Sequence, residues 1–240
     1  EEESNIQKNV RDFCNNELKP TVVERNRKNE FDKELYPKFG SLGVLGQTVK
    51  THGGSGTSNL AYGLVAYEFE KIDSSYRSSI SVQSSLVIHP INEFGSQEQK
   101  DKYLPQLIKG EKIGCFGLTE SEAGSDPASM KTSFKKTKDG YILNGSKNWI
   151  TNAPIADIFI IWAIEENKDH KSIKGFIIEK NTEGLNTSTI ENKTSLKISP
   201  TGQIILNNVF VPNNLCLENT EGWKSVFSCL NKARFGISWG

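Results

Sequence analysis

The sequence has little that would bind a metal ion or build a disulfide framework. Its four cysteines show no CxxC spacing, and its three histidines are scattered along the chain. These residues are Cys14, Cys115, Cys216, Cys229, His52, His89 and His170. Metal sites and disulfide frameworks usually group such side chains tightly. We therefore expect no metal site, and buried thiols in a reducing compartment.

An excess of charge of either sign is also missing. The 29 Lys and Arg residues balance 29 Asp and Glu residues, so electrostatics does not favour a nucleic acid or an anionic membrane as partner. The longest apolar run, 158–164, is far shorter than the roughly 20 residues that span a bilayer. No signal peptide is recognisable at Glu1. We expect a protein that binds no nucleic acid and is not integral to a membrane.

Helical periodicity dominates the first part of the chain. With 240 residues, 35% of them hydrophobic and 24% charged, the composition is globular and the length suffices for two cores. Apolar residues recur at helical spacing over 6–18, 32–43 and 64–72. Ser96 and Gln99 form the pattern of a capping box, which opens a helix that Gly110 closes.

After Gly110 the hydrophobic period changes to that of β-strands. Short β-forming runs occupy 113–118, 158–162, 175–178, 204–206 and 209–211. Asp139-Gly140 and Asn144-Gly145 are turn signals between such runs. Strands at this spacing predict a sandwich or small barrel, and helical character returns from about Glu221. The predicted fold is α+β: an all-helical domain (1–112), a β domain (113–218) and the start of a C-terminal helical domain (219–240).

A predicted strand that runs into small and hydroxyl-bearing residues is the first segment that could carry chemistry. Phe116-Gly117-Leu118-Thr119 leads into the polar stretch 120–126. The N–H groups and hydroxyls of such a loop can approach an anionic group such as a pyrophosphate. A tight surface turn with a helix cap at Ser125 or Asp126 explains the same composition, and the residues alone favour this simpler reading.

The segment 145–152 pairs an aromatic ring with a hydroxyl. On a regular strand, Trp149 and Thr151 point to the same face, where they could meet a planar heterocycle. More often, such a tryptophan belongs to the core and such a threonine is a satisfied strand residue. The stretch 140–147 superficially resembles a phosphate loop. We reject that reading because Ser146 precedes Lys147 and a hairpin turn takes the place of the helix.

Two arginines have polar neighbours that could help them bind an anion. Glu70, Arg77 and Ser78 lie around a helix–helix junction, where an arginine beside a serine can clamp a carboxylate. Asn231 and Arg234 stand three residues apart on one helix face. Taken alone, Arg77 is better explained as an exposed charge, and Arg234 either holds an anion or stays solvated. The sequence has no Rossmann glycine motif and no recognisable nucleophile.

Taken together and in this order, these segments resemble the acyl-CoA dehydrogenase family over essentially all 240 residues. The matching pieces are 116–125, 149–151 and Arg234-Phe235-Gly236. Within the family, 66–70, 73–78, 81–87, 89–90 and 230–237 are similar to glutaryl-CoA dehydrogenases. Departures such as Ser121-Glu122-Ala123 leave Thr119 and Ser125 of the loop in place.

The resemblance implies FAD, held in an extended form between the β domain and the helices. Trp149 would lie against the isoalloxazine, and Thr151 would hydrogen-bond near N5, the atom that accepts hydride. The loop would line the flavin and the pyrophosphate. The implied cofactor-binding residues are Phe116, Gly117, Leu118, Thr119, Ser125, Trp149, Ile150 and Thr151.

The resemblance also implies an acyl-CoA thioester as substrate. Arg77, with Ser78 and Glu70 nearby, would receive the distal carboxylate of glutaryl-CoA, since an uncharged acyl chain would leave the arginine unpaired. Ser125 and the helix 227–234 would contact the acyl-CoA. The implied substrate-binding residues are Glu70, Arg77, Ser78, Ser125, Phe227, Leu230, Asn231 and Arg234.

The family reaction implied here is oxidation of glutaryl-CoA and its decarboxylation to crotonyl-CoA. Electrons would leave through electron-transfer flavoprotein, and the complete protein would be a homotetramer in the mitochondrial matrix or, in a prokaryote, the cytoplasm. The family's catalytic base is a glutamate of the C-terminal helical domain, which would lie beyond Gly240, so the catalytic residue is unknown here. The alternatives are another acyl specificity, a non-catalytic scaffold subunit, and a flavin oxidase.

Overall fold

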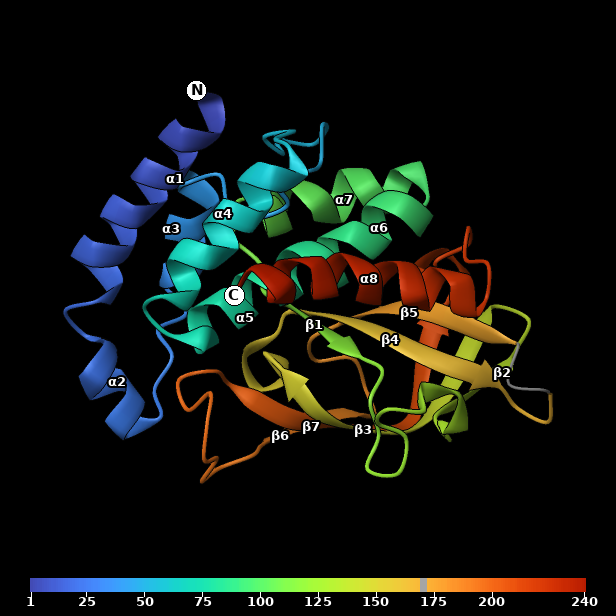
Figure 1. The fold of residues 1–240 in the computed structure, drawn as a ribbon. Coiled ribbons are helices and arrows are strands. Elements are labelled where there is room, and N and C mark those ends of the chain that lie inside the picture. The colour runs from blue at the N-terminus through green and yellow to red at the C-terminus, as the bar shows by residue number, and fades with distance from the viewer. Residues whose placement is uncertain (169–171) are drawn as a thin grey trace.

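Helices and strands segregate along the chain as the hydrophobic periods predict. The computed structural model describes residues 1–168 and 172–240, so His170 lies outside the described part. A layer of helices packs against a curled sheet, and the last helix lies along the junction between them (Figure 1). The predicted fold class, a helical domain followed by a β domain and a further helix, is confirmed.

The helices are α1 (Glu2–Phe13), α2 (Val22–Lys28), α3 (Leu35–Ser41), α4 (Asn59–Glu70), α5 (Ser74–Ser81), α6 (His89–Phe94), α7 (Gln97–Ile108) and α8 (Trp223–Trp239). Two π-helical segments, Cys14–Leu18 and Val82–Ile88, continue α1 and α5. The strands are β1 (Gly114–Gly117), β2 (Ser133–Lys136), β3 (Gly140–Thr151), β4 (Ile158–Glu165), β5 (Ile173–Glu179), β6 (Leu185–Thr189) and β7 (Thr201–Pro212).

Local signals explain the helix ends. The capping box of α7 is confirmed: the Ser96 hydroxyl accepts from the Gln99 N–H, and the Gln99 side chain accepts from the Ser96 N–H. The helix predicted from Asp32 begins only at Leu35, because the Asp32 carboxylate accepts the Glu34 N–H and holds a turn there. Helix α2 was not predicted. It buries no side chain, so it has no apolar stripe to recognise.

One continuous helical path crosses the middle of the molecule. Helix α5, the π-helical segment Val82–Ile88 and α6 follow one another without a break. π-Helical turns are rare and frequently occur at functional sites. Inside this path, the Gln83 amide donates to the Leu107 and Lys112 carbonyls and accepts the Gly114 N–H. The segment thus fixes where β1 begins.

The strands form one curled, mixed sheet. Its order is β1-β4-β2-β3-β7-β6, and β5 pairs with β4. β1 and β2 run parallel to β4, while the other pairings are antiparallel. The curl encloses its own core, in which Phe134, Tyr141 and Phe176 contact each other edge to face. A second core fills the space between the sheet and the helices.

Two details of the predicted β domain are wrong. Asn144-Gly145 does not end a strand but lies inside β3, where the pairing with β7 shifts register between Leu143 and Gly145. Gly145 has a φ of 146°, and a Cβ there would come within 2.7 Å of the Thr132 Cα, so only glycine fits. The runs predicted as two strands at 204–206 and 209–211 form one strand, β7.

All four cysteine side chains are buried and unpaired, as predicted. Burial raises the pKa of the Cys14 and Cys229 thiols to about 12, so both stay protonated at neutral pH. Within the described ranges, no helix is long and apolar enough to cross a membrane. In the same ranges, no three His, Cys, Asp or Glu side chains converge on a point where a metal ion could sit.

Candidate cofactor and substrate site

A cavity of about 160 Å³ opens where the helices meet the sheet. Four parts of the chain build its wall: the π-helical segment, β1 with the loop after it, the end of β3, and α8. The nine lining residues are Val82, Leu86, Phe116, Leu118, Thr119, Trp149, Ile150, Thr151 and Leu230. We call it the central cavity. Seven of these nine residues belong to the cofactor-binding and substrate-binding sets predicted from the sequence. The fold therefore brings these distant segments of the chain together.

Trp149 stands at the mouth of the central cavity in a strained conformation. Its φ is 59°, which a non-glycine residue seldom adopts, and 58% of its surface is exposed. The pairing of β3 with β7 shifts register between Lys147 and Ile150, so a bulge carries Trp149 out of the strand. The bulge therefore interrupts the alternation of side chains that a regular strand would have. Trp149 and Thr151 still share the cavity, but through the bulge rather than through a regular strand.

The chemistry of the cavity wall fits a planar heterocycle with polar edges. Val82, Leu86 and Leu230 supply apolar contact surface, and Trp149 adds an exposed aromatic face. Among the residues that the structure describes, no hydrogen bond engages the hydroxyl of Thr119 or that of Thr151. An apolar pocket with a few convergent polar groups is the usual form of a cofactor site. An isoalloxazine ring has this combination of flat faces and hydrogen-bonding edges.

Two residues of the predicted cofactor set do not line the central cavity. Ser125 is exposed in the loop that follows β1. Gly117 is buried behind the wall, where a Cβ would come within 2.5 Å of Ile161 Cδ1 and 3.2 Å of Lys147 Cγ. Gly117 therefore allows close packing beneath the cavity, whereas Ser125 is free to meet a part of a ligand that extends outside it.

Arg77 lies on α5 with most of its hydrogen-bonding capacity unused. Its Nε donates to Glu70 Oε2 at 2.7 Å, and Glu70 also accepts from the Ser74 hydroxyl. The Arg77 side chain is only 13% exposed. In the described part of the chain, neither terminal guanidinium nitrogen makes a hydrogen bond. Two N–H groups on a planar fork are thus left to bind a carboxylate side-on.

Arg77 also lines a small apolar hollow, which is too small to hold a water molecule. It is lined by Tyr62, Ala66, Phe69, Arg77, Ile80 and Ser81. Ser81 is followed directly by Val82 of the central cavity, and Arg77 stands five positions before Val82, roughly 7.5 Å along the helix axis. Ser78, the other predicted residue here, is half-buried on α5. Arg77 therefore lies within two helical turns of Val82 in the cavity wall.

The residues of α8 that were predicted to bind substrate differ in whether they line the central cavity. Leu230 lines the central cavity, while Phe227 is 41% exposed and packs against the ring of Trp223. The predicted shared face of Asn231 and Arg234 is confirmed, since Arg234 Nη1 donates to Asn231 Oδ1 at 3.2 Å. Both side chains are exposed, which leaves them available to an anionic ligand.

The sequence interpretation assigned no role to four residues at the site. Val82 and Leu86 line the central cavity from the π-helical segment, where apolar residues look the same as ordinary core. Glu120 and Lys147 form a buried ion pair directly behind it, at 2.9 Å. The sequence signal for this ion pair is Lys147 itself, a charged residue at a buried position of β3.

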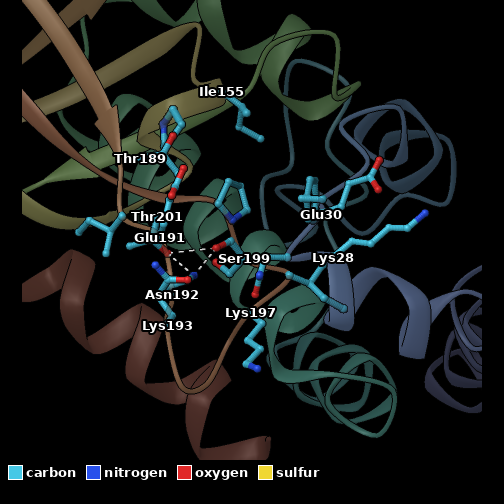
Figure 2. Close-up of a pocket in the computed structure, with 16 residues that line it drawn as sticks. Lys28, Glu30, Ile155, Thr189, Glu191, Asn192, Lys193, Lys197, Ser199 and Thr201 are labelled. Carbon is cyan, nitrogen blue, oxygen red and sulfur yellow. Dashed lines mark hydrogen bonds between the residues drawn. The ribbon is translucent and has the colours of Figure 1, made fainter.

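A larger cavity of about 410 Å³ lies elsewhere, between the end of α2 and the turn from β6 to β7 (Figure 2). None of the residues predicted from the sequence lines it. Its central cation, Lys193, donates to the carbonyls of Leu196 and Ser199 and to Thr201 Oγ1 (Figure 2). Lys193 is thus engaged in holding its own loop.

The chain thus combines a helical domain with a curled mixed sheet, and the central cavity lies where the two meet. Two family models match the chain: acyl-CoA dehydrogenase, N-terminal domain, over residues 1–111, and acyl-CoA dehydrogenase, middle domain, over residues 115–209. The chain belongs to the acyl-CoA dehydrogenase family, as its sequence motifs predicted. Members of this family use FAD, which confirms the predicted cofactor at the level of the family.

Several bacterial proteins resemble the chain over nearly its whole length. A short-chain-specific acyl-CoA dehydrogenase of Clostridium acetobutylicum is 36% identical over 99% of this chain and 63% of its own length. A glutaryl-CoA dehydrogenase of Mycobacterium smegmatis, solved in complex with FADH2, is 42% identical with a TM-score of 0.97, over 100% of this chain and 61% of that one. Butyryl-CoA dehydrogenase of Megasphaera elsdenii is 36% identical with a TM-score of 0.92, over 99% and 64%. The chain thus spans less than two thirds of the length of these relatives, and they lend no support to a mitochondrial location.

Proposed function

We propose that this chain forms the flavin-binding and acyl-binding part of an FAD-dependent dehydrogenase that oxidises glutaryl-CoA and then releases CO2 to give crotonyl-CoA. The observation that carries the choice of substrate is Arg77. Its guanidinium is largely buried on α5, the helix that continues into the cavity-lining segment Val82–Ile88, and Glu70 occupies only its Nε. The relative solved with FADH2 is itself a glutaryl-CoA dehydrogenase.

Residues of the central cavity have distinct tasks in this proposal. FAD, when bound, supplies the hydride acceptor for the β-carbon of the acyl chain. Trp149 offers a flat face to the ring system, and the hydroxyls of Thr119 and Thr151 offer hydrogen bonds to its polar edges. Leu230 and Val82 keep water from the reacting carbons. Ser125, Asn231 and Arg234 lie outside the cavity, where they are placed to bind the pyrophosphate and the coenzyme A part.

Removal of the α-proton needs a base that the central cavity does not provide. Among the described residues, no carboxylate lines the cavity. Glu70 is engaged by Arg77 and by the Ser74 hydroxyl, so it is better suited to orienting the arginine. The proposal therefore assigns the base to the portion of the relatives' length that this chain does not span. Electron-transfer flavoprotein as acceptor and a homotetrameric assembly belong to the same proposal.

The second candidate is a dehydrogenase for short uncharged acyl-CoA thioesters, which the likeness to butyryl-CoA dehydrogenase favours. The two candidates share the cofactor and differ only at the end of the acyl chain. In the first, Arg77 receives the distal carboxylate. In the second, a substrate would leave the buried guanidinium with unpaired N–H groups, which is costly.

Tryptophan fluorescence provides a test of the cofactor site that is independent of turnover. Because Trp149 is exposed at the mouth of the central cavity, we expect FAD added to the apoprotein to quench its emission. Trp149→Phe should remove most of the quenching and weaken FAD binding about two- to tenfold, in line with roughly 0.5–1.5 kcal/mol for an aromatic stacking contact. Trp162→Phe, at a fully buried ring that does not line the cavity, is the control. Equal quenching in wild type and Trp149→Phe would place the flavin elsewhere.

A further inference from the structure

A fully satisfied ion pair lies directly behind the central cavity. Lys147 is completely buried, and its Nζ donates to Glu120 Oε1 at 2.9 Å and to the Leu118 carbonyl at 3.0 Å. The Glu120 carboxylate also accepts the N–H groups of Lys131 and Thr132, at 2.7 and 3.0 Å. Burying two charges is expensive, and apolar residues often stabilise a fold equally well. We therefore expect this ion pair to have a role other than stabilising the fold.

The bond from Lys147 fixes one peptide group of the cavity wall. Leu118 and Thr119 both line the central cavity, whereas Lys147 does not. Because the peptide is planar and trans, holding the Leu118 carbonyl toward Lys147 turns the Thr119 N–H to the opposite side. No acceptor for that N–H is found in the described part of the chain. By holding the Leu118 carbonyl, the Lys147 ammonium thus leaves the Thr119 N–H available to a ligand, next to the Thr119 hydroxyl.

The same lysine stands at the base of the bulge that carries Trp149. The register shift of β3 begins at Lys147, and the next residue, Asn148, donates its N–H to the Thr119 carbonyl at 2.9 Å. The Asn148 side chain accepts the Trp149 N–H and donates to the Ser121 hydroxyl. Loop and bulge are therefore joined twice, on the inside by Lys147 and on the outside by Asn148.

We infer that Lys147 is a positioning residue for the cofactor: held by Glu120, its ammonium joins Leu118 to the bulge and so presents Thr119 and Trp149 to the flavin. The inference rests on the proposed function of the central cavity. Lys147 touches no ligand and acts through the two segments it joins. Burial lowers the pKa of Lys147 to about 8, and the Glu120 carboxylate opposes this decrease by favouring the charged ammonium. The partner carboxylate is thus what keeps the ammonium charged at neutral pH.

A double variant separates the positioning role of Lys147 from its effect on the stability of the fold. Lys147→Met alone leaves Glu120 buried without its counter-charge, so it should destabilise the protein for a trivial reason. In the double variant Lys147→Met with Glu120→Gln, no charge is left unpaired, and the thermal midpoint should recover most of the loss. The bond to the Leu118 carbonyl stays absent. We expect this double variant to bind FAD at least tenfold more weakly and to exchange the amide hydrogens of 118–120 faster than wild type.

Lys193→Met is the matched control, because Lys193 holds a loop by three hydrogen bonds at the other cavity (Figure 2). It should leave FAD affinity unchanged. Asn148→Ala removes the side-chain bonds to Ser121 and to the Trp149 N–H, while the backbone bond from Asn148 to the Thr119 carbonyl and the buried charges stay in place. It should weaken FAD binding severalfold even if the double variant does not fold. FAD affinity within twofold of wild type in the folded double variant, or in Asn148→Ala, overturns the inference and leaves the proposed function intact. No FAD binding by the wild-type protein overturns both.

Discussion

Replacing Arg77 by methionine is expected to lower kcat/KM for glutaryl-CoA by about 10²–10³-fold, which corresponds to roughly 3–4 kcal/mol, within the range lost when one partner of a buried charge pair is removed. The side chain is only 13% exposed, and it lies on α5, the helix that continues into the cavity-lining segment Val82–Ile88. Turnover of butyryl-CoA, which has no distal carboxylate, should change less than about threefold because it makes no use of the charge. Steady-state kinetics with both thioesters measures the effect.

Three controls make the Arg77 experiment selective. Arg77→Lys keeps the charge but loses the planar fork, so its glutaryl-CoA activity should lie between wild type and Arg77→Met. Arg11→Met breaks a similar Arg–Glu pair, with Glu68 on the far side of α4, and should spare both substrates. The thermal midpoint shows whether Glu70, left without its partner, loosens the helix junction. If both substrates lose activity equally in Arg77→Met, the carboxylate clamp is wrong.

Replacing Asn152 by alanine is expected to lower the free energy of unfolding by about 2–4 kcal/mol, since two buried groups lose their donor. Asn152 is fully buried, and its Nδ2 donates to the Tyr36 hydroxyl at 2.8 Å and to the Gly114 carbonyl at 3.1 Å. It thereby joins α3, β1 and the end of β3 directly behind Thr151. Chemical denaturation of wild type and variant gives the difference.

Asn181 provides a control for the backbone at Asn152. Both asparagines adopt left-handed conformations, with φ of 69° and 68°, but Asn181 is exposed. Alanine suffers the same backbone strain at either position. Asn181→Ala should therefore cost about 1 kcal/mol or less, the share that belongs to φ alone. Equal losses at the two positions would mean that the buried hydrogen bonds of Asn152 contribute nothing.

The order of domains and the set of segments at the site could be predicted because they leave strong local patterns. The change of hydrophobic period after Gly110 separates helices from strands, and the capping box at Ser96 marks the start of α7. The motifs around Thr119 and Trp149 are specific only in combination. Each alone favoured a structural explanation, and the structure brings both to one cavity.

Features that depend on tertiary packing could not be predicted. The bulge that places Trp149 at φ 59° contradicts strand alternation, and it exists because the chain around it is tied to the loop after β1. Asn144-Gly145 has the composition of a hairpin turn, yet β7 pairs across it and turns it into a bulge. The Glu120–Lys147 pair joins residues 27 positions apart, and no periodicity connects them.

The measurement that tests the central claim most directly is the anaerobic visible spectrum of the purified flavoprotein before and after addition of glutaryl-CoA, with butyryl-CoA as comparison. The account predicts a flavin band that glutaryl-CoA bleaches rapidly and butyryl-CoA bleaches slowly or not at all. Preferential bleaching by butyryl-CoA would contradict the role given to Arg77. A purified protein that carries no flavin and takes up none would contradict the account as a whole.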